Sequence, residues 1–399
     1  MAAFPAAREG APARADVLVI GGAIVGSAVA YFMRTFAPGM SVVVIEPDPT
    51  YALASTPRAS GGARRLFSCP ENIAMSQWSI DFIRDAPRTL AVDGEPAPVD
   101  WHEGGYLFIV PPRDLPVLQA NHRTQRAMGC EVDLLDPAGL AARFPCMRVD
   151  DLGGGVHSPR DGWCDPSALM QAFRRKARAL GATYVQDRVV ALERRGTAVT
   201  HARLASGTTL AAEAFVNASG AWAAGICAMV DMPLPVAPMR RFEHYFTTPA
   251  RLEPLPYVKD PERLAFRPEG QGYSGGVVHS HEPYGFNFDV DHDHFERVVW
   301  PALARRFPPF EAVRCQRTWS GLYEQCTLDG NPILGPWRGR VENLHVASGF
   351  SGHGMMHAPA AGRAIAERIV HGRYVSLDLG AFGYERVVRD EPYPEHGIL

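Results

Sequence analysis

A glycine pattern near the start of the chain has the spacing of a phosphate-binding turn. Gly21, Ala23 and Gly26 follow the apolar run 17–20 and open the stretch 23–36, which has helical character. A strand, a tight turn and a helix in this order bind the pyrophosphate of a dinucleotide through backbone N–H groups. Alanine stands where a glycine usually lets the backbone approach the pyrophosphate, but the remaining pattern still predicts such a turn.

An acidic residue follows at the distance that a ribose contact requires. Glu46 closes a second apolar strand, 41–45, twenty residues after Gly26. A carboxylate there accepts hydrogen bonds from ribose hydroxyls and disfavours a 2′-phosphate. The turn, its flanking strands and Glu46 together predict an ADP-binding βαβ unit that suits NAD or FAD and disfavours NADP.

A second glycine-rich turn lies near the other end of the chain. The apolar strand 344–347 leads into the segment 349–354, and a helical pattern then runs to about residue 370. Backbone N–H groups and the positive end of a helix favour an anion at such a turn. Because a reduced flavin is anionic around N1, this second turn favours FAD over NAD.

The elements between these turns alternate in the manner of an α/β protein. A helix begins at Asp165 and Pro166, which suit the N-cap and first helical positions, and ends before Gly181. A strand over 182–186 follows, and the later apolar strand 215–218 opens into a turn of small residues. This rhythm predicts a mainly parallel sheet.

Composition limits the other functions. The 399 residues suggest two or three domains, and 46% hydrophobic with 21% charged residues is ordinary for a globular protein. A net charge of −3 argues against nucleic acid or an anionic membrane as partner. The uncharged run 17–33 is short for a membrane span and holds three glycines, and residues 1–14 have the composition of a frayed tail. We expect no targeting segment, no integral membrane segment and a cytoplasmic location.

Cysteine and lysine usage restrict the chemistry further. Seven cysteines without a Cys-x-x-Cys spacing fit a reducing compartment and predict no zinc site. The acidic and histidine-rich run 289–294 suits a helix N-cap better than a metal site. Only Lys176 and Lys259 are lysines among forty basic residues, so a fixed positive charge in a site is expected to be arginine.

Five segments, in family order and spanning nearly the whole chain, resemble the glycine oxidase/sarcosine oxidase branch of the D-amino-acid-oxidase (DAO) superfamily of FAD enzymes. They are residues 19–26, 217–222, 319–322, 329–335 and 349–354.

Two further segments, 372–382 and 68–72, resemble one subgroup of that branch. The subgroup contains the FAD-dependent oxidoreductase domain-containing proteins and bacterial iminodiacetate oxidases.

The resemblance implies an α/β fold with an α+β second domain. A Rossmann-like FAD-binding domain of the glutathione-reductase type would be combined with an antiparallel-sheet substrate domain. The expected division is a tail over 1–15, a discontinuous FAD-binding domain over 16–88, 150–228 and 320–375, a substrate domain over 89–149 and 229–319, and a C-terminal extension over 376–399.

The resemblance also implies which residues bind FAD. They occupy the two glycine turns, the end of the second strand and the segments that cross near the flavin in the family. They are Gly21, Gly22, Ala23, Ile24, Val25, Gly26, Glu46, Pro47, Ser60, Gly61, Gly62, Arg65, Val189, Ser219, Gly220, Trp222, Gly321, Gly352, His353, Gly354 and Met355.

Several positions depart from the family pattern. Sarcosine oxidases attach FAD through a cysteine whose place is Leu322 here, and Cys326 is out of register, so we expect non-covalent FAD. The arginines and lysine that hold a substrate carboxylate in these enzymes are replaced by Ser68, Met356 and Tyr323. A substrate acid must therefore be bound by other groups.

Four residues are predicted to act on the substrate or the flavin. Arg65 and His353 would provide charge near flavin N1, and Arg267 and Tyr323 would position the substrate, with no obligatory general base. Arg267 is the first choice for a substrate carboxylate and Arg65 the second.

Structural roles remain open for some of these side chains. Arg267 could instead pair with Glu269 or Glu262, and Arg65 could pair with a surface carboxylate. The neighbouring Arg64 is the better candidate for such a surface pair. His279 and His281 face either the site or solvent.

The expected function is FAD-dependent oxidation of the C–N bond of a small secondary amine or amino acid, with an acidic N-substituted glycine favoured. Hydride would pass to flavin N5, and the imine would hydrolyse in water. The partners would be a small-molecule amine and either oxygen, giving hydrogen peroxide, or a quinone or other carrier. Alternatives are a 2-hydroxy-acid dehydrogenase and a flavin-containing assembly or scaffold factor.

The lysine count bears on the electron acceptor. Sarcosine oxidases activate oxygen with a lysine on the substrate-domain sheet, a place that falls at Gly275 or Gly276 here. Neither Lys176 nor Lys259, expected in a loop, matches that place. The positive charge would come from Arg65, a histidine or bound water, or else oxygen would be a poor acceptor.

Overall fold

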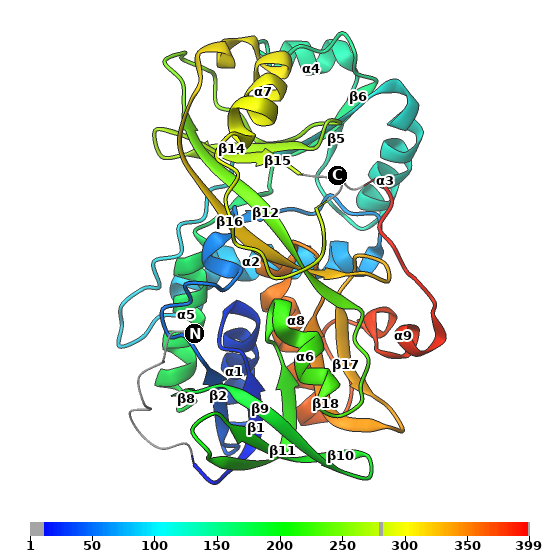
Figure 1. The fold of residues 1–399 in the computed structure, drawn as a ribbon. Coiled ribbons are helices and arrows are strands. Elements are labelled where there is room, and N and C mark those ends of the chain that lie inside the picture. Colours follow the sequence, from blue (N-terminus) through cyan, green and yellow to red (C-terminus); the bar gives the residue numbers. More distant parts are fainter. Residues whose placement is uncertain (1–11, 279–281, 398–399) are drawn as a thin grey trace.

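The computed structural model describes residues 12–278 and 282–397. Two large β-sheets divide the molecule into a lower half, which holds the N-terminal strand, and an upper half (Figure 1). The chain passes between the halves several times, so each half is built from segments far apart in the sequence.

The lower half is built on a sheet whose central strands are parallel. Strand β1 pairs in parallel with β2 on one side and with β11 on the other, so that Val19 lies opposite Val44 and Val216. The strand order places the carboxyl ends of β1, β2, β11 and β18 at one edge. The strands are β17 (Ile333–Trp337), β18 (Val341–Ser348), β11 (Thr209–Asn217), β1 (Arg14–Ile20), β2 (Val42–Glu46) and β8 (Thr183–Gln186), with β9 (Val189–Arg195) and β10 (Ala198–Leu204) attached to β11.

One face of this sheet is covered by helices. Helix α1 packs against both α5 and α8, and α8 also packs against α2. Gly362 of α8 allows the closest of these approaches, since an added Cβ would lie 2.6 Å from the Ala28 methyl carbon. These helices are α1 (Ile24–Phe36), α2 (Pro70–Thr89), α5 (Pro166–Ala179) and α8 (Gly354–His371); the short helix α6 (Ala223–Ala228) packs with the core of β9, β10 and β11.

The second sheet forms the upper half and is mostly antiparallel. Its two longest strands, β12 and β16, run diagonally from the upper half into the lower one (Figure 1). In sheet order the strands are β16 (Arg314–Cys326), β12 (Val236–Thr247), β15 (Gly272–Val277), β14 (Leu264–Glu269), β13 (Tyr257–Lys259), β4 (Tyr106–Val110), β6 (Gly154–Ser158) and β5 (Asp133–Leu135).

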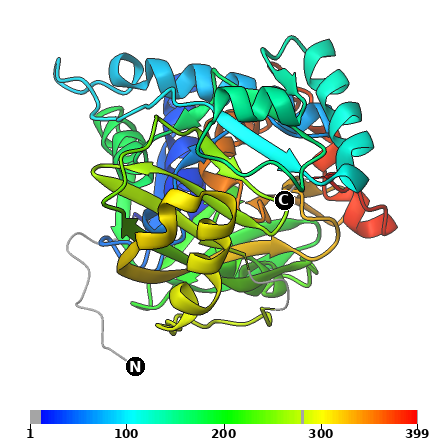
Figure 2. The same ribbon diagram turned by 90° about the horizontal axis from the view of Figure 1, so that it is seen from above.

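The two faces of the second sheet differ in chemistry because side chains alternate along a strand. Phe246, Phe266 and Val258 point outward into an apolar cluster with Leu303 of α7 (Trp300–Arg306), and Figure 2 shows α7 across this outer side. The outer cover also includes α4 (Pro137–Arg143), whereas α3 (Leu115–Ala127) lies beside it and contacts α2. The inner face carries polar side chains and faces the lower half.

Short elements complete the chain. A two-stranded sheet of β3 (Gly62–Ala63) and β7 (Gly162–Trp163) joins segments from both halves. Single-turn helices are η1 (Thr56–Arg58), η2 (Pro112–Asp114), η3 (Gly220–Trp222), η4 (Phe295–Val299), η5 (Pro308–Ala312) and η6 (Gly380–Phe382), and the last helix is α9 (Glu385–Arg389).

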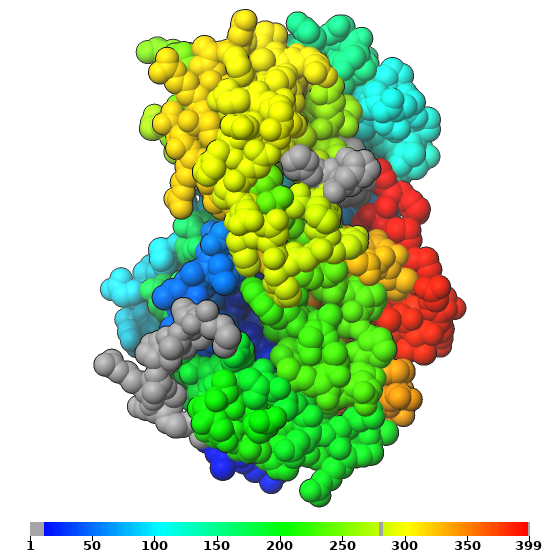
Figure 3. Space-filling view, viewed as in Figure 1, coloured from blue at the N-terminus to red at the C-terminus, as the bar shows by residue number. Residues whose placement is uncertain are grey.

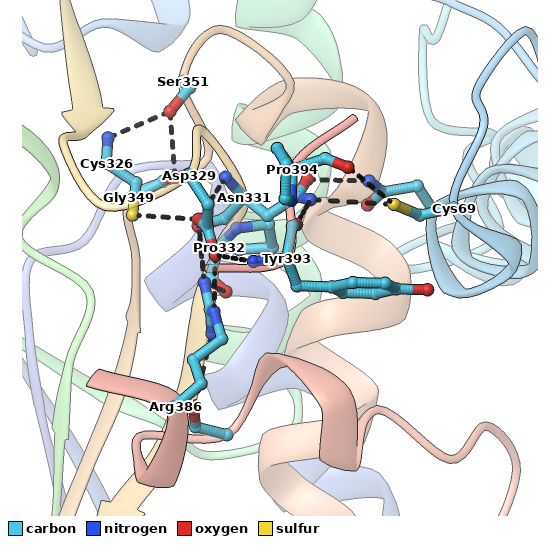
Figure 4. Close-up of polar contacts among 12 residues, drawn as sticks. Cys69, Cys326, Asp329, Asn331, Pro332, Gly349, Ser351, Arg386, Tyr393 and Pro394 are labelled. Carbon is cyan, nitrogen blue, oxygen red and sulfur yellow. Dashed lines mark hydrogen bonds and ion pairs between the residues drawn. The ribbon is translucent and has the colours of Figure 1, made fainter. Parts of the chain in front are cut away.

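The C-terminal segment is tied back onto the lower half by a buried ion pair. Arg386 Nε donates to Asp329 Oδ2 at 2.8 Å, and the Tyr393 N–H donates to the same oxygen at 3.0 Å (Figure 4). Burial acts to raise the pKa of Asp329, but hydrogen bonds from Arg386 and the Tyr393 backbone lower it overall. Glu395 then accepts hydrogen bonds from Ser68 and the Cys69 N–H at the N-terminus of α2.

The helices and strands predicted around the two glycine turns and after Asp165 are confirmed in type and approximate extent. The prediction that an acid of the run 289–294 caps a helix is wrong: the helical segment η4 begins at Phe295 with His294 at the N-cap position, and no side chain among the described residues caps it. The helix expected over 23–36 is α1, and the helix beginning at Asp165 is α5, with the Asp165 carboxylate accepting from the Ser167 and Ala168 N–H groups. The α/β fold with a second, antiparallel sheet is also as predicted. Within the described residues, none of the helices combines the length and the apolar character that crossing a membrane would require.

Candidate functional site

A cavity of about 1010 Å³ lies between the carboxyl edge of the first sheet and the inner face of the second. Its lining comes from the turn after β1, the end of β2, residues 53–62, the turn after β18, and strands β12, β13 and β16. In the space-filling view, dark-blue atoms from the early part of the described chain lie in a hollow below the yellow segment that crosses between the halves (Figure 3). The cavity therefore joins the two predicted anion-binding turns to the second sheet.

The first glycine turn is shaped by close backbone packing. A Cβ at Gly26 would lie 1.9 Å from the Gly21 carbonyl oxygen, so only glycine lets α1 start this close to β1. The Gly22 N–H donates to Glu46 Oε2 at 2.8 Å. Gly21 and Ala23 line the cavity, whereas Gly22 and Gly26 support the turn from behind.

Glu46 lines the nucleotide end of the cavity and is fixed by backbone donors. Burial raises its pKa, although the N–H groups of Asp48 and Gly22 oppose that effect. The Tyr51 hydroxyl lines the same end and is buried without a hydrogen-bond partner. An adenine nucleotide with free ribose hydroxyls would supply hydrogen-bond partners to Glu46 and Tyr51 at this end.

The second glycine turn contacts strand β16. A Cβ at Gly352 would lie 2.5 Å from the Tyr323 ring, so this turn and that ring form one continuous wall. Glu324, which sequence reasoning missed, accepts from the Ser348 hydroxyl at 2.7 Å. Burial raises the pKa of Glu324 to about 7 against the hydrogen bonds from Ser348 and the Gly349 and Phe350 backbone.

Two adjacent arginines have exchanged the roles expected for them. Arg65 lies outside the cavity lining, and its guanidinium pairs with the buried Asp161 at 2.8 Å and with Asp81 at 3.6 Å. Arg64, expected at the surface, is 2% exposed and lines the cavity. Arg64, and not Arg65, is therefore the arginine of this pair that lies at the cavity.

Arg64 is held against the second glycine turn. Its Nη2 lies 3.1 Å from His353 Nε2, and its guanidinium lies 4.4 Å from the centre of the Phe67 ring. Burial and the charge of Arg64 hold the pKa of His353 well below its usual value, so His353 Nε2 is neutral and accepts from Arg64. The Arg64 Nε is buried, and none of the described residues accepts a hydrogen bond from it.

Arg267 and Tyr323, the two predicted substrate contacts, differ in position. Arg267 lies outside the lining, and its guanidinium donates to the Ser60 carbonyl at 2.6 Å and pairs with Glu269. This is the structural pairing that the sequence had left open. Tyr323 does line the cavity, beneath the guanidinium of Arg241 at 4.9 Å.

The inner face of the second sheet contributes side chains that no sequence motif indicated. Arg241, Glu243 and Lys259 line the cavity from β12 and β13. Lys259, expected in a loop away from the site, is instead the last residue of β13, with its Nζ 5.8 Å from the centre of the Phe108 ring. Burial and the nearby Arg64 charge lower the pKa of Lys259 well below its usual value.

The cavity brings together most of the predicted site residues. Gly22, Gly26, Arg65 and Arg267 are the exceptions. Those that line the cavity are Gly21, Ala23, Ile24, Val25, Glu46, Pro47, Ser60, Gly61, Gly62, Val189, Ser219, Gly220, Trp222, Gly321, Tyr323, Gly352, His353, Gly354 and Met355.

Other predictions concern cysteines and metals. Leu322 lines the cavity, whereas the Cys326 thiol lies outside the lining and donates to Asp329 Oδ1 at 3.4 Å. Among residues 12–278 and 282–397, no three His, Cys, Asp or Glu side chains come together as metal ligands. His279 and His281 lie outside the described residues.

The fold and the cavity define a class of protein. A βαβ turn with a carboxylate at the end of its second strand, and a second glycine turn beside a sheet face at the other end of the cavity, fit an extended dinucleotide. The orphaned Tyr51 hydroxyl and Arg64 Nε are the polar atoms that such a ligand would satisfy. This is the arrangement of a flavin-dependent oxidoreductase.

Sequence comparison defines the family. The pattern described as "DAO: FAD dependent oxidoreductase" matches residues 16–368. The chain therefore belongs to the DAO family of FAD-dependent oxidoreductases, as the sequence motifs had indicated.

Two relatives differ in their sequence identity to this chain and in the share of their own length that it covers. FAD-dependent oxidoreductase domain-containing protein 1 of Bos taurus is 33% identical over 431 residues, which cover 97% of this chain and 88% of the relative. Mitochondrial sarcosine dehydrogenase of Homo sapiens is 26% identical over 384 residues, which cover 91% of this chain and 40% of the relative.

Solved structures share the fold. L-proline dehydrogenase from P. horikoshii has a TM-score of 0.85 at 24% identity, covering 96% of this chain and 100% of that one. Iminodiacetate oxidase from Chelativorans sp. BNC1 has a TM-score of 0.75 at 21% identity, covering 92% and 98%. At these identities the similarity establishes the architecture alone.

Proposed function

We propose that the protein oxidises the C–N bond of a small secondary amine or amino acid that carries a carboxylate, and that an acidic N-substituted glycine is the favoured class. The relation to sarcosine dehydrogenase supports an amine as the substrate. The observation that carries the proposal is a pair of arginines, Arg64 and Arg241, which line the cavity. Their Nε atoms are buried, and no group in the described part of the chain accepts a hydrogen bond from them.

Unsatisfied guanidinium groups in a cavity call for anionic ligands. A guanidinium keeps its charge in proteins. Arg64 donates to the neutral His353 and Arg241 to the Arg240 carbonyl, but neither of these partners carries the negative charge that would compensate a buried cation. Arg64 lies beside the second glycine turn, where the flavin would be held. Arg241 lies on strand β12 of the second sheet, over the Tyr323 ring. One flavin and one substrate carboxylate would account for both groups.

Each part of the cavity has a distinct task in this reaction. When bound, FAD supplies a two-electron acceptor at N5 for the hydrogen on the carbon next to nitrogen. The Gly352–Gly354 turn and Arg64 would supply positive electrostatic potential to the bound flavin, and side chains of the second sheet would orient the substrate in the same cavity. The imine product needs only water for hydrolysis.

An anaerobic reduction screen tests the proposal. The yellow holoprotein is mixed without oxygen with sarcosine, glycine, iminodiacetate, proline, D-alanine and lactate, and the visible flavin absorbance is followed. We expect bleaching by at least one carboxylated amine and none by lactate. Admitting air and assaying hydrogen peroxide then distinguishes an oxidase from a dehydrogenase.

The controls give the opposite outcome a definite meaning. Bleaching by lactate but by no amine would replace the proposal with 2-hydroxy-acid oxidation. A flavin that none of the amines bleaches would contradict amine oxidation altogether.

A further inference from the structure

Strand β12 presents a basic and an acidic side chain to the cavity, two residues apart. Arg241 lies opposite Gly321 and Glu243 lies opposite Trp319 on β16, and both line the cavity because alternate residues of a strand share a face. Gly321 has no side chain, so it leaves the space beside Arg241 open. Residues two apart on a strand are separated by about 7 Å, enough for a small molecule between their head groups.

Among the described residues, no carboxylate forms an ion pair with Arg241. Its Nη1 donates to the carbonyl of the adjacent Arg240 at 3.0 Å, while its Nε is buried without a partner. Glu282, the nearby acid, is already paired with Arg240 at 2.6 Å. Burial lowers the pKa of Arg241, which is the expected effect of low solvation on an unpaired cation.

The Arg241 guanidinium is also fixed in orientation. It lies 4.9 Å from the centre of the Tyr323 ring, so its plane is supported by an aromatic surface. An arginine held in this way binds a carboxylate through two parallel hydrogen bonds.

Glu243 has one oxygen in use. The Ser274 hydroxyl donates to Glu243 Oε1 at 2.7 Å, and the residue lines the cavity. Burial raises the pKa of Glu243 to about 7, while the Ser274 hydrogen bond and the charge of Arg267 act to lower it. The groups that face this carboxyl from neighbouring strands are Tyr323, Ser274, Arg267, Glu269 and Tyr257.

None of these groups neutralises Glu243 directly. Arg267, the cation among its neighbours on β14, is held by the Ser60 carbonyl and Glu269. Tyr257 is bonded to the Ser60 hydroxyl at 2.8 Å. The carboxyl is therefore available to a ligand in the cavity.

We propose that Arg241 binds the carboxylate and Glu243 the nitrogen of an α-amino acid substrate, and that Glu243 accepts the proton of the substrate ammonium group. This inference rests on the proposed amine oxidation and gives its substrate site a residue basis. In the proton step one N–H bond of the ammonium breaks and one O–H bond of the Glu243 carboxylic acid forms. One proton moves and no electrons move, and the product is the neutral amine that oxidation requires.

Arg241 also provides a replacement for the carboxylate-binding residues that the family has at other positions. The sequence has Tyr323 where an arginine is found in glycine oxidases. Arg241, on the neighbouring strand, lies directly over that tyrosine ring. The positive charge is kept in the same part of the cavity but is supplied from β12.

Two ligands separate the two halves of the clamp. (Methylthio)acetate keeps the carboxylate of sarcosine but has sulfur in place of nitrogen, so its binding reports on Arg241 and not on Glu243. Binding to the holoprotein is measured by titration calorimetry, which does not depend on turnover. We expect Arg241→Met to weaken binding by about 30-fold or more, Arg241→Lys to restore part of the loss, and Glu243→Gln to change it less than about twofold.

Iminodiacetate turnover then tests the proton step. In the wild type, kcat/KM should rise with pH as Glu243 ionises. In Glu243→Gln the rise should move to the higher pH at which the free ammonium loses its own proton. Arg314→Met is the control, because Arg314 is exposed at the start of β16 and lies outside the cavity lining, and it should keep the wild-type affinity and pH profile.

The outcomes distinguish this inference from the proposed function. Wild-type affinity for (methylthio)acetate in Arg241→Met, or no binding by the wild type, would overturn the Arg241 assignment. An unchanged pH profile in Glu243→Gln would overturn the proton step while leaving amine oxidation intact. If no amine reduces the wild-type flavin, amine oxidation and the proton step fail together, and the binding titration still decides on Arg241. Melting temperature and flavin content of each variant show that it is folded and loaded.

Discussion

The two ends of the cavity are built in different ways. The nucleotide end is made by backbone groups of short local segments, such as the turn 21–26 and the N–H donors to Glu46. The opposite end is made by side chains from separate strands, among them Arg241 and Glu243 of β12, Lys259 of β13 and Tyr323 of the distant β16. A backbone cradle tolerates little change in shape, whereas a side-chain surface can change its chemistry without altering the fold.

The largest effect is expected at the nucleotide end, from Gly26→Val. The added side chain would overlap the Gly21 carbonyl, since even a Cβ would lie 1.9 Å from that oxygen. We expect a colourless protein with almost no FAD and a lower melting temperature, as measured by visible absorbance and thermal unfolding. Gly39→Ala is the control, because a Cβ there would meet no atom within 4 Å. Normal FAD content in Gly26→Val would show that the turn does not hold the nucleotide.

The next effect separates the two adjacent arginines at the boundary between the ends. Arg65→Met leaves the buried Asp161 without its cation and should lower the free energy of unfolding by about 3–5 kcal/mol. Arg64→Met should have a smaller effect on unfolding and a larger one on the flavin spectrum, because Arg64 lines the cavity. Denaturant unfolding and absorbance spectra measure the two effects.

A double variant supplies the control for this pair. Adding Asp161→Asn to Arg65→Met removes the unpaired charge and should recover part of the lost stability. Equal destabilisation by Arg64→Met and Arg65→Met would contradict the division of roles.

A smaller effect is the pH dependence of stability that comes from Glu324, the carboxyl beside the second glycine turn. Because burial raises the pKa of Glu324 to about 7 from about 4.5 in the unfolded chain, the folded state favours the protonated acid. Its contribution to stability is full below about pH 4.5 and is lost as pH rises through about 7. Between pH 5 and pH 8 the wild type should therefore lose on the order of 2 kcal/mol of its free energy of unfolding, a value reduced because the carboxyl faces the cavity. In Glu324→Gln this loss should be absent.

The measurement is the free energy of unfolding of the holoprotein at both pH values. Glu342→Gln, an exposed carboxyl on β18, should leave the wild-type pH dependence unchanged. Identical pH dependence in wild type and Glu324→Gln would show that Glu324 does not titrate in this range.

The smallest effect is expected from Lys259→Met, at the end of the cavity that the second sheet forms. If oxygen is the acceptor, loss of the lysine should slow reoxidation of the reduced flavin by about tenfold, or ~1.4 kcal/mol of the barrier. Stopped-flow mixing of reduced enzyme with oxygen measures this rate. Lys176, whose Nζ donates to the Ala91 carbonyl at 2.7 Å away from the cavity, provides the control Lys176→Met. A reoxidation rate independent of Lys259 would leave the second sheet without a part in oxygen chemistry.

Much of the nucleotide end could be predicted from sequence because its signals are local. Gly21, Gly26 and Glu46 lie within one βαβ unit, and their spacing reflects a strand, a turn and a helix that form in fixed order. The second turn at Gly352 was found for the same reason. These segments also carry the family resemblance that the sequence comparison confirms.

The side chains at the sheet end could not be predicted in this way. Arg64 and Arg65 are adjacent in sequence, yet Arg65 pairs with Asp161 and only Arg64 lines the cavity. Lys259 was expected in a loop, but pairing of β13 with β4 and β14 turns it inward. Glu324 gave no signal, because its partner Ser348 lies on a different strand.

The sequence by itself determined the α/β fold, the FAD-type dinucleotide site and the family, since each depends on short segments whose backbone geometry follows from glycine spacing and apolar strands. Only the tertiary structure decided which charged side chains line the cavity. The face on which Arg241 and Glu243 lie is set by the register of β12 against β16. A shift of one residue in that register would turn both side chains away from the cavity, and no local pattern in the sequence records it.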